Sequence, residues 1–171
     1  ERKTVLAIRT PEVDRVSADV PADVWQAAQA AARAQRITPA SLLLGAYTQA
    51  LAEWTGMDEF TVNVTLFDRD FTVPGIERVV GDFTSLTPVA CTTQPSAHQP
   101  SPASIAASSA TLADVARHAQ QNLATVRDYD SAGALWVQRE LLRLTGDPYR
   151  AMLPVVYTCG LGLLAEDVST S

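Results

Sequence analysis

The 171-residue sequence has few cysteines and no long apolar run. Cys91 and Cys159 stand far apart, with no Cys-x-x-Cys motif and no Cys/His cluster around either of them. Neither a metal site nor a disulfide framework is therefore predicted, and we expect both thiols to be reduced, as in a cytoplasmic protein. No apolar run approaches the ~20 residues that a membrane-spanning helix requires.

Clustered basic residues are also missing. The chain carries 13 Lys and Arg against 19 Asp and Glu, for a formal net charge of -6. Because a surface that binds nucleic acid or anionic lipid needs grouped Lys and Arg side chains, neither partner is expected. A hydrophobic content of 47% is enough for a substantial core in one ordinary domain or in one lobe of a larger one. The abrupt beginning and end of the chain suggest a fragment.

The segment from Phe60 to Leu66 alternates apolar and polar residues, which is typical of a strand with one face in the core. Its apolar set is Phe60, Val62, Val64 and Leu66, and its polar set is Thr61, Asn63 and Thr65. A turn follows at Gly81 to Ser85, where a carboxylate, an aromatic ring and two hydroxyls come in a row. We expect further strands at Val13 to Val20, at Leu86 to Thr92 and at Leu153 to Cys159, the last one central and buried.

Four helices are expected, at about 22–35, 38–55, 111–126 and 134–144. Thr38 as N-cap before Pro39 begins the second helix and Gly56 ends it. Its apolar stripe comprises Leu43, Tyr47, Leu51 and Trp54, which we place in the core. Helices and strands alternate, so the sequence predicts a layered α/β fold. Residues 95–109 are rich in Pro, Ser and Ala, and are predicted to be a flexible surface loop.

Four stretches carry a family resemblance. They are TPASLLLGAYTQALAEW at 38–54, NVTLFDR at 63–69, GDFTSL at 81–86 and LPVVYTCGL at 153–161. In this order they resemble the C-terminal half of a heterocyclization domain of nonribosomal peptide synthetases, a branch of the condensation-domain superfamily. The resemblance covers essentially all of residues 1–171. It implies a chloramphenicol-acetyltransferase-like lobe, with a mixed sheet packed by helices and an active-site tunnel shared with an N-terminal lobe.

The resemblance also implies an activity. Such domains join two carrier-bound aminoacyl or peptidyl thioesters by an amide bond and then cyclodehydrate a Cys, Ser or Thr side chain to a thiazoline or oxazoline. The implied partners are donor and acceptor peptidyl carrier proteins, which carry phosphopantetheine, an adjacent adenylation domain and the N-terminal lobe. No cofactor bound directly to this chain and no metal is expected. The isolated 171 residues are expected to be inactive, because the acidic motif of the first lobe is not in the sequence.

Thr158 matches the threonine that similar domains use in cyclodehydration, together with an aspartate farther downstream. The sequence departs from the family at Cys159, where Ser is usual, and at Tyr157, where Phe is usual. Asp82, Thr84 and Asn63 are candidates for the substrate tunnel. Asp82 and Thr84 could instead shape a turn through hydrogen bonds to backbone N–H groups, and Asn63 could hold a loop.

Two other functions compete with this prediction. One is an ordinary condensation or epimerization lobe, which the GDFTS sequence at 81–85 argues against, since ordinary condensation domains tend to read Gly-x-Phe-Val-Asn at that place. The other is a noncatalytic lobe that only docks carrier proteins or neighbouring domains. The sequence does not indicate which side chain is cyclised or which natural product results.

Overall fold

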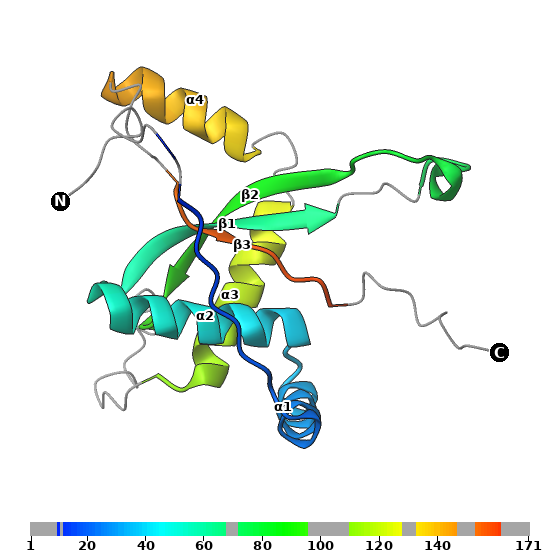
Figure 1. Ribbon diagram of the computed structural model, residues 1–171, viewed down its shortest axis with the longest axis vertical. Coiled ribbons are helices and arrows are strands. Elements are labelled where there is room, and N and C mark those ends of the chain that lie inside the picture. Colours follow the sequence, from blue (N-terminus) through cyan, green and yellow to red (C-terminus); the bar gives the residue numbers. More distant parts are fainter. Residues whose placement is uncertain are drawn as a thin grey trace.

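A computed structural model describes residue 10 and residues 12–67, 72–95, 110–127, 133–146 and 153–161 (Figure 1). Its centre is a three-stranded sheet in the order β2-β1-β3. Strand β1 (Glu59–Phe67) pairs antiparallel with β2 (Thr84–Thr92) and parallel with β3 (Val156–Tyr157). The mixed sheet is packed by helices, so the predicted α/β class is confirmed.

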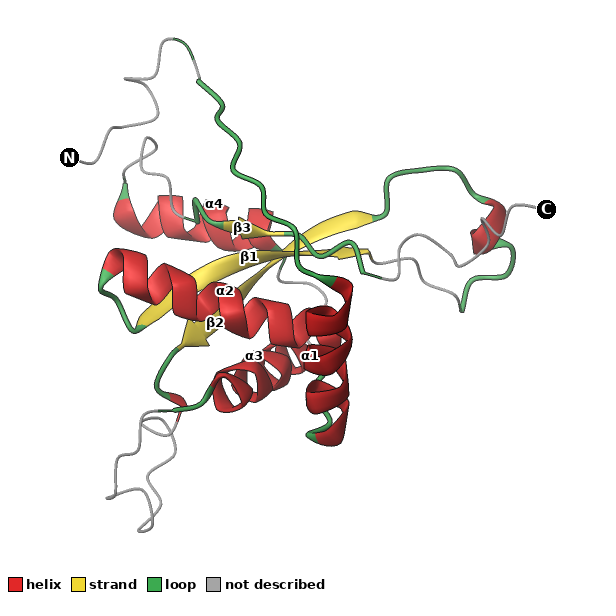
Figure 2. Ribbon diagram, turned by 60° about the horizontal axis from the view of Figure 1, so that its bottom comes forward, coloured by secondary structure: helices red, strands yellow, loops and turns green. Residues whose placement is uncertain are grey.

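Helices cover both faces of this sheet. Helices α2 (Pro39–Thr55) and α3 (Leu112–Arg127) lie on one side, and α4 (Ala134–Thr145) lies on the other (Figures 1 and 2). Helix α1 (Ala22–Ala34) joins the first group, because Ala32 and Ile37 pack with Ala116 of α3 in a small buried cluster. A short 3-10 helix, η2 (Ile76–Arg78), lies in the connection between β1 and β2.

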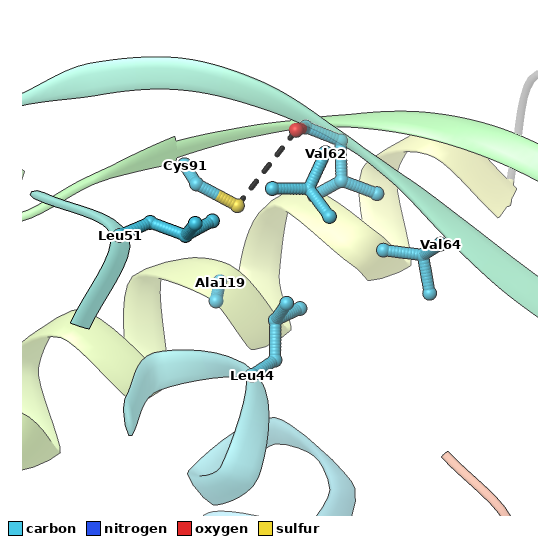
Figure 3. Packing of buried hydrophobic residues seen from close by; sticks show 7 residues of the cluster. Leu44, Leu51, Val62, Val64, Cys91 and Ala119 are labelled. Carbon is cyan, nitrogen blue, oxygen red and sulfur yellow. Dashed lines mark hydrogen bonds between the residues drawn. The ribbon is translucent and has the colours of Figure 1, made fainter. Parts of the chain in front are cut away.

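The main core lies between the sheet and the pair α2/α3. Val62 and Val64 of β1 are buried there, as the alternation along the strand predicts. They pack with Leu44 and Leu51 of α2, with Ala119 of α3, and with Val89 and Cys91 of β2 (Figure 3). Burying each of the larger apolar side chains contributes about 1.5–3 kcal/mol. This face of the sheet therefore supplies much of the stability.

Small residues let α2 and α3 approach closely. A Cβ atom added at Gly45 would lie 2.8 Å from both Cα and Cβ of Ala116, closer than packed atoms tolerate. Thr48, farther along α2, is also fully buried and donates its hydroxyl to the Leu44 carbonyl at 2.8 Å. The close contact depends on the absence of a side chain at position 45.

The predicted helix ends are confirmed by their capping contacts. The Thr38 hydroxyl accepts the backbone N–H of Ser41 at 3.2 Å, and Gly56 ends α2 in the left-handed conformation with φ 69°. At the start of α3, Thr111 and Asp114 form a reciprocal capping box. The Asp114 carboxylate accepts the Thr111 N–H at 3.1 Å, and the Asp114 N–H donates to the Thr111 hydroxyl at 3.3 Å.

The predicted strand at 13–20 is wrong. The described residues of this segment form no strand, and Val13 and Val16 are 93% and 95% exposed. Alternation can place side chains on two faces, but a strand also needs a hydrogen-bonding neighbour. No neighbour among the described residues pairs with this segment.

The predicted stripe of α2 is displaced by about one residue. Its buried face runs through Ser41, Leu44, Gly45, Thr48 and Leu51. Leu43 and Tyr47 are half-buried, and Trp54 is 85% exposed, so the prediction that Trp54 belongs to the core is wrong. The close contact with α3 sets the rotation of the helix. It turns small residues such as Gly45 toward α3, and a prediction based on large apolar residues does not include them.

The last strand is also shorter than predicted. Only Val156 and Tyr157 pair with β1, and Val156 is 49% exposed, so the predicted central buried strand at 153–159 is wrong. Strand β3 lies at an edge of the sheet, and no strand in the described part of the chain covers its other side. The predicted surface loop at 95–109 lies outside the described residues, apart from Pro95. No helix in the described ranges is both long and apolar enough to span a bilayer.

Candidate functional site

The strand register gathers most of the predicted site residues on one face of the sheet. Paired residues of neighbouring strands point to the same side, and side chains alternate along each strand. Asn63 pairs with Val156 and Val64 pairs with Tyr157, so the next pair brings Thr65 beside Thr158. In β2, Thr84 pairs with Phe67, which lies two residues beyond Thr65. This face is the one opposite α2 and α3.

Thr158 makes a direct contact with β1. Its hydroxyl lies 2.8 Å from the hydroxyl of Thr65, and either oxygen can be the donor. Thr158 is exposed, whereas Thr65 is half-buried. A hydroxyl group has one proton and two lone pairs. The Thr158 hydroxyl can therefore keep its bond to Thr65 and still exchange a hydrogen bond with another molecule.

Tyr157, the residue before Thr158, faces the opposite side of the sheet. Its hydroxyl donates to the Ala40 carbonyl in the first turn of α2 at 3.0 Å, and its ring lies 5.6 Å from that of Tyr47. Burial raises the pKa of the Tyr157 phenol, and the neighbouring Cys159 adds to the increase. The phenol therefore stays protonated as a hydrogen-bond donor. Tyr157 fixes β3 to α2, and alternation directs Thr158 away from the core.

Asn63 lies in the same sheet face, two residues before Thr65. Its side chain is 1% exposed, and its Nδ2 donates to the Leu153 carbonyl at 3.0 Å. Its backbone N–H donates to the Val155 carbonyl at 2.9 Å. These bonds fix the segment that leads into β3. Holding a loop is the structural role that the sequence allows as the alternative for Asn63. The Oδ1 atom is buried and has no hydrogen-bond partner within the described part of the chain.

Asp82 and Thr84 form a local turn. The Asp82 carboxylate accepts the backbone N–H of Thr84 at 2.8 Å, an arrangement typical of an Asx-turn. The pKa of Asp82 is lowered, mainly by a hydrogen bond from the Thr84 side chain and to a smaller extent by one from the Thr84 backbone. Both residues are exposed, so the turn leaves the carboxylate open to solvent. The turn-shaping contact that the sequence suggested is present.

The predicted residues thus form two groups. Thr158 and Asn63 lie around the β1–β3 pairing, whereas Asp82 and Thr84 lie at the start of β2. Because β2 and β3 flank β1, the backbones of Thr84 and Thr158 are at least about 10 Å apart across the sheet. A substrate would have to span this face to meet both groups.

Sequence reasoning did not single out Thr65 as a site residue. Thr65 belongs to the polar set of the alternating strand, but nothing local distinguishes it from Thr61. The distinguishing contact comes from Thr158, which lies 93 positions away in the chain. Only a parallel pairing between the NVTLFDR and LPVVYTCGL stretches would have indicated it.

The hollow at the beginning of β1 lies apart from these residues. It has a volume of about 450 Å³ and is lined by Glu59, Phe60, Thr61, Ala90, Cys91, Thr92, His118 and Asn122. Asn122 donates its side-chain amide to the Ala90 carbonyl at 2.9 Å and lies 3.1 Å from Nε2 of His118. None of the predicted site residues lines this hollow.

Comparison with known proteins shows the family to which this chain belongs. The family model described as "Condensation domain" matches residues 1–149, and the chain therefore belongs to the condensation domain family. The chain is similar to the phenyloxazoline synthase MbtB of Mycobacterium sp. (strain MCS), with 35% identity over 136 residues, covering 78% of this chain and 10% of that protein. It is also similar to the pyochelin synthetase PchE of Pseudomonas aeruginosa (strain UCBPP-PA14), with 31% identity over 156 residues, covering 91% and 10%.

Comparison with solved structures supports the same family. The cyclization-docking bidomain of EpoB, a nonribosomal peptide synthetase from Sorangium cellulosum, superposes with a TM-score of 0.64 at 26% identity, covering 84% of this chain and 26% of that chain. The resemblance to the heterocyclization branch and the chloramphenicol-acetyltransferase-like fold class are confirmed by these matches. This chain spans about a tenth of the curated relatives named above.

Proposed function

We propose that this chain is the C-terminal lobe of a heterocyclization domain. The complete domain condenses carrier-bound aminoacyl or peptidyl thioesters and cyclodehydrates a Cys, Ser or Thr side chain to a thiazoline or oxazoline. The observation that carries this proposal is the position of Thr158. Its exposed hydroxyl lies on the sheet face opposite the core, directly after strand β3, which Tyr157 fixes to α2. Similarity to proteins named phenyloxazoline synthase supports the same chemistry.

The reaction has two stages. In the first, the amine of the acceptor substrate attacks the donor thioester carbonyl, a C–N bond forms, and the thiol of the donor's phosphopantetheine arm leaves. In the second, the side-chain sulfur or oxygen of the acceptor adds to the new amide carbonyl and loses its proton. The carbonyl oxygen then leaves as water while the nitrogen gives up its proton and forms the C=N bond. The net loss is one water.

The second stage needs protons to leave the attacking side chain and the amide nitrogen, and to reach the oxygen that departs as water. A positioned hydroxyl can donate a hydrogen bond to the oxygen that leaves as water, and such proton-transfer assistance contributes about 10²–10⁴-fold to a rate. Thr158 is our candidate for this role. Asn63, Asp82 and Thr84 are proposed to line the substrate path, because the register places Asn63 and Thr84 on the same sheet face as Thr158.

The partners follow from this chemistry. Donor and acceptor peptidyl carrier proteins would present the substrates on phosphopantetheine arms, an adjacent adenylation domain would load the acceptor, and an N-terminal lobe would complete the tunnel. Within this chain, the hydrogen bond that the Thr84 backbone N–H donates to Asp82 gives the start of β2 a defined shape for one wall.

The test is Thr158→Ala in the complete domain, supplied with loaded donor and acceptor carrier proteins. We expect the variant to form the amide but to lower the rate of ring closure at least about a hundredfold. Intact-mass analysis of the acceptor carrier would then show the uncyclised product, heavier by one water than the ring product. Thr61→Ala is the matched control, because Thr61 is an exposed threonine on the same face of β1.

Three results would contradict the proposal. Unimpaired ring formation by Thr158→Ala would remove Thr158 from the chemistry. A parent domain that forms the amide and never loses water would indicate an ordinary condensation domain, and a parent domain that forms neither product would indicate a docking role.

A further inference from the structure

We propose that Thr65 is a positioning residue for ring closure, which acts by holding the Thr158 hydroxyl in its reactive orientation. This inference rests on the proposed function, because it gives Thr65 a role only through Thr158. The observation behind it is the hydroxyl–hydroxyl contact of 2.8 Å between two strands that are 93 positions apart in sequence. The resemblance that indicated Thr158 assigned nothing to Thr65.

Thr158 needs a restraint from another strand, because it lies just beyond β3. It follows the last paired residue of β3 and is exposed. Among the described residues, the side chain of Thr158 makes its hydrogen bond with Thr65. A threonine hydroxyl without a hydrogen bond can rotate about χ1 between staggered positions, which moves its oxygen by about 2 Å. The contact with Thr65 selects one of these positions.

Thr65 is well placed to supply this restraint. It lies in β1, the central strand, between β2, where Leu86 is its partner, and β3. Its neighbour Val64 is buried in the main core and pairs with Tyr157. The backbone of Thr65 is therefore held by both neighbouring strands and by the core below. A hydroxyl on a rigid strand is a more precise partner than one on a loop.

The hydrogen bond also leaves Thr158 able to react. If Thr65 donates, the Thr158 proton is free to point at the substrate; if Thr158 donates, both lone pairs of its oxygen are free to accept a proton. Either arrangement fixes the oxygen position that a proton transfer requires. Misplacing a catalytic group by about 1 Å can lower a rate by about 10²-fold.

The decisive variant is Thr65→Val in the complete domain, which removes the hydroxyl and keeps the β-branched shape. We expect ring closure to slow by about three- to tenfold, since one hydrogen bond is lost. The rate of amide formation should stay unchanged, so the uncyclised amide accumulates in the intact-mass assay. Thr65→Ser restores the hydroxyl and should return ring closure to within about twofold of the parent.

The matched control is Thr61→Val, the same chemical change four residues earlier on the same face of β1. Thr61 makes no side-chain hydrogen bond to any described residue, so ring closure and amide formation should both stay at the parent rate. A thermal melt of each variant checks that the fold is retained. If Thr65→Val slowed amide formation and ring closure equally, the role would be structural and the inference would be overturned.

A double variant tests whether Thr65 acts through Thr158. If it does, adding Thr65→Val to Thr158→Ala should cause no further loss of ring closure. A further loss in the double variant would show that Thr65 acts independently, against the inference. If Thr158→Ala accumulates amide and Thr65→Val does not, this inference fails and the proposed function stands. If Thr158→Ala itself accumulates no amide, the proposed role of Thr158 is wrong, and the inference about Thr65 is overturned with it.

Discussion

The two faces of strand β1 differ in what they contact. Toward α2 and α3, Val62 and Val64 are buried in a packed apolar cluster. Toward the opposite side, Asn63 is buried with one unpartnered oxygen among the described residues, and Thr65 meets the exposed Thr158. The alternation of side chains along β1 therefore separates the packed core from the face that carries the candidate site residues. A change on one face should alter stability, and a change on the other should alter the product.

The end of strand β3 and the residue after it repeat this division. Tyr157 faces α2, where its hydroxyl bonds to Ala40, and Thr158 faces the candidate site. Tyr157 and the candidate residue Thr158 are joined by one peptide bond, so the contacts of Tyr157 with α2 help to set where Thr158 lies. This comparison can be tested by variants on the packed side that spare the site.

The largest expected effect on stability is that of Leu44→Ala. Leu44 is 1% exposed at the centre of the main core (Figure 3). Its truncation leaves a cavity and should lower the free energy of unfolding by about 2–5 kcal/mol, measured by urea denaturation of the complete domain. The ratio of ring product to uncyclised amide should stay at the parent value in the folded fraction. A change in that ratio with little loss of stability would contradict the separation of the two faces.

Tyr157→Phe should have a smaller effect. It removes the hydrogen bond to Ala40 and keeps the ring beside Tyr47, so the free energy of unfolding should fall by about 0.5–1.5 kcal/mol. Because the ring still packs on α2, Thr158 should keep its place and the product ratio should not change. Tyr47→Phe is a control for loss of a phenol nearby. Amide accumulation in Tyr157→Phe would show that the hydroxyl helps to position Thr158.

The smallest effect is expected for Trp54→Ala. Trp54 is 85% exposed near the end of α2, and substitutions at exposed positions usually change the free energy of unfolding by no more than about 0.5 kcal/mol. Urea denaturation compares this variant with Leu44→Ala on the same helix. A loss of about 2 kcal/mol or more would show that Trp54 is buried in the complete protein, as the sequence pattern first predicted.

Local chemistry made several features predictable. Thr38, Gly56 and the pair Thr111 and Asp114 indicate helix ends because their capping contacts involve residues only a few positions apart. The alternation at 60–66 predicts strand β1 and its buried face, because this pattern also lies in residues that are close together in the chain. The motif matches went further and indicated the family and Thr158.

Other predictions failed because they depend on distant neighbours. The sequence predicts a strand at 13–20, but no described strand pairs with this segment. The rotation of α2 follows from the close contact between Gly45 and Ala116, which a stripe of large apolar residues does not indicate.

The sequence by itself determined the elements with local signals, the family and the candidate threonine, since each of these is written in residues close together in the chain. Only the tertiary structure decided which residue touches that threonine. The parallel pairing of β1 with β3 brings Thr65 to Thr158 across 93 positions. Strand register is set by the packing of the whole sheet against its helices, so no local pattern could specify this contact.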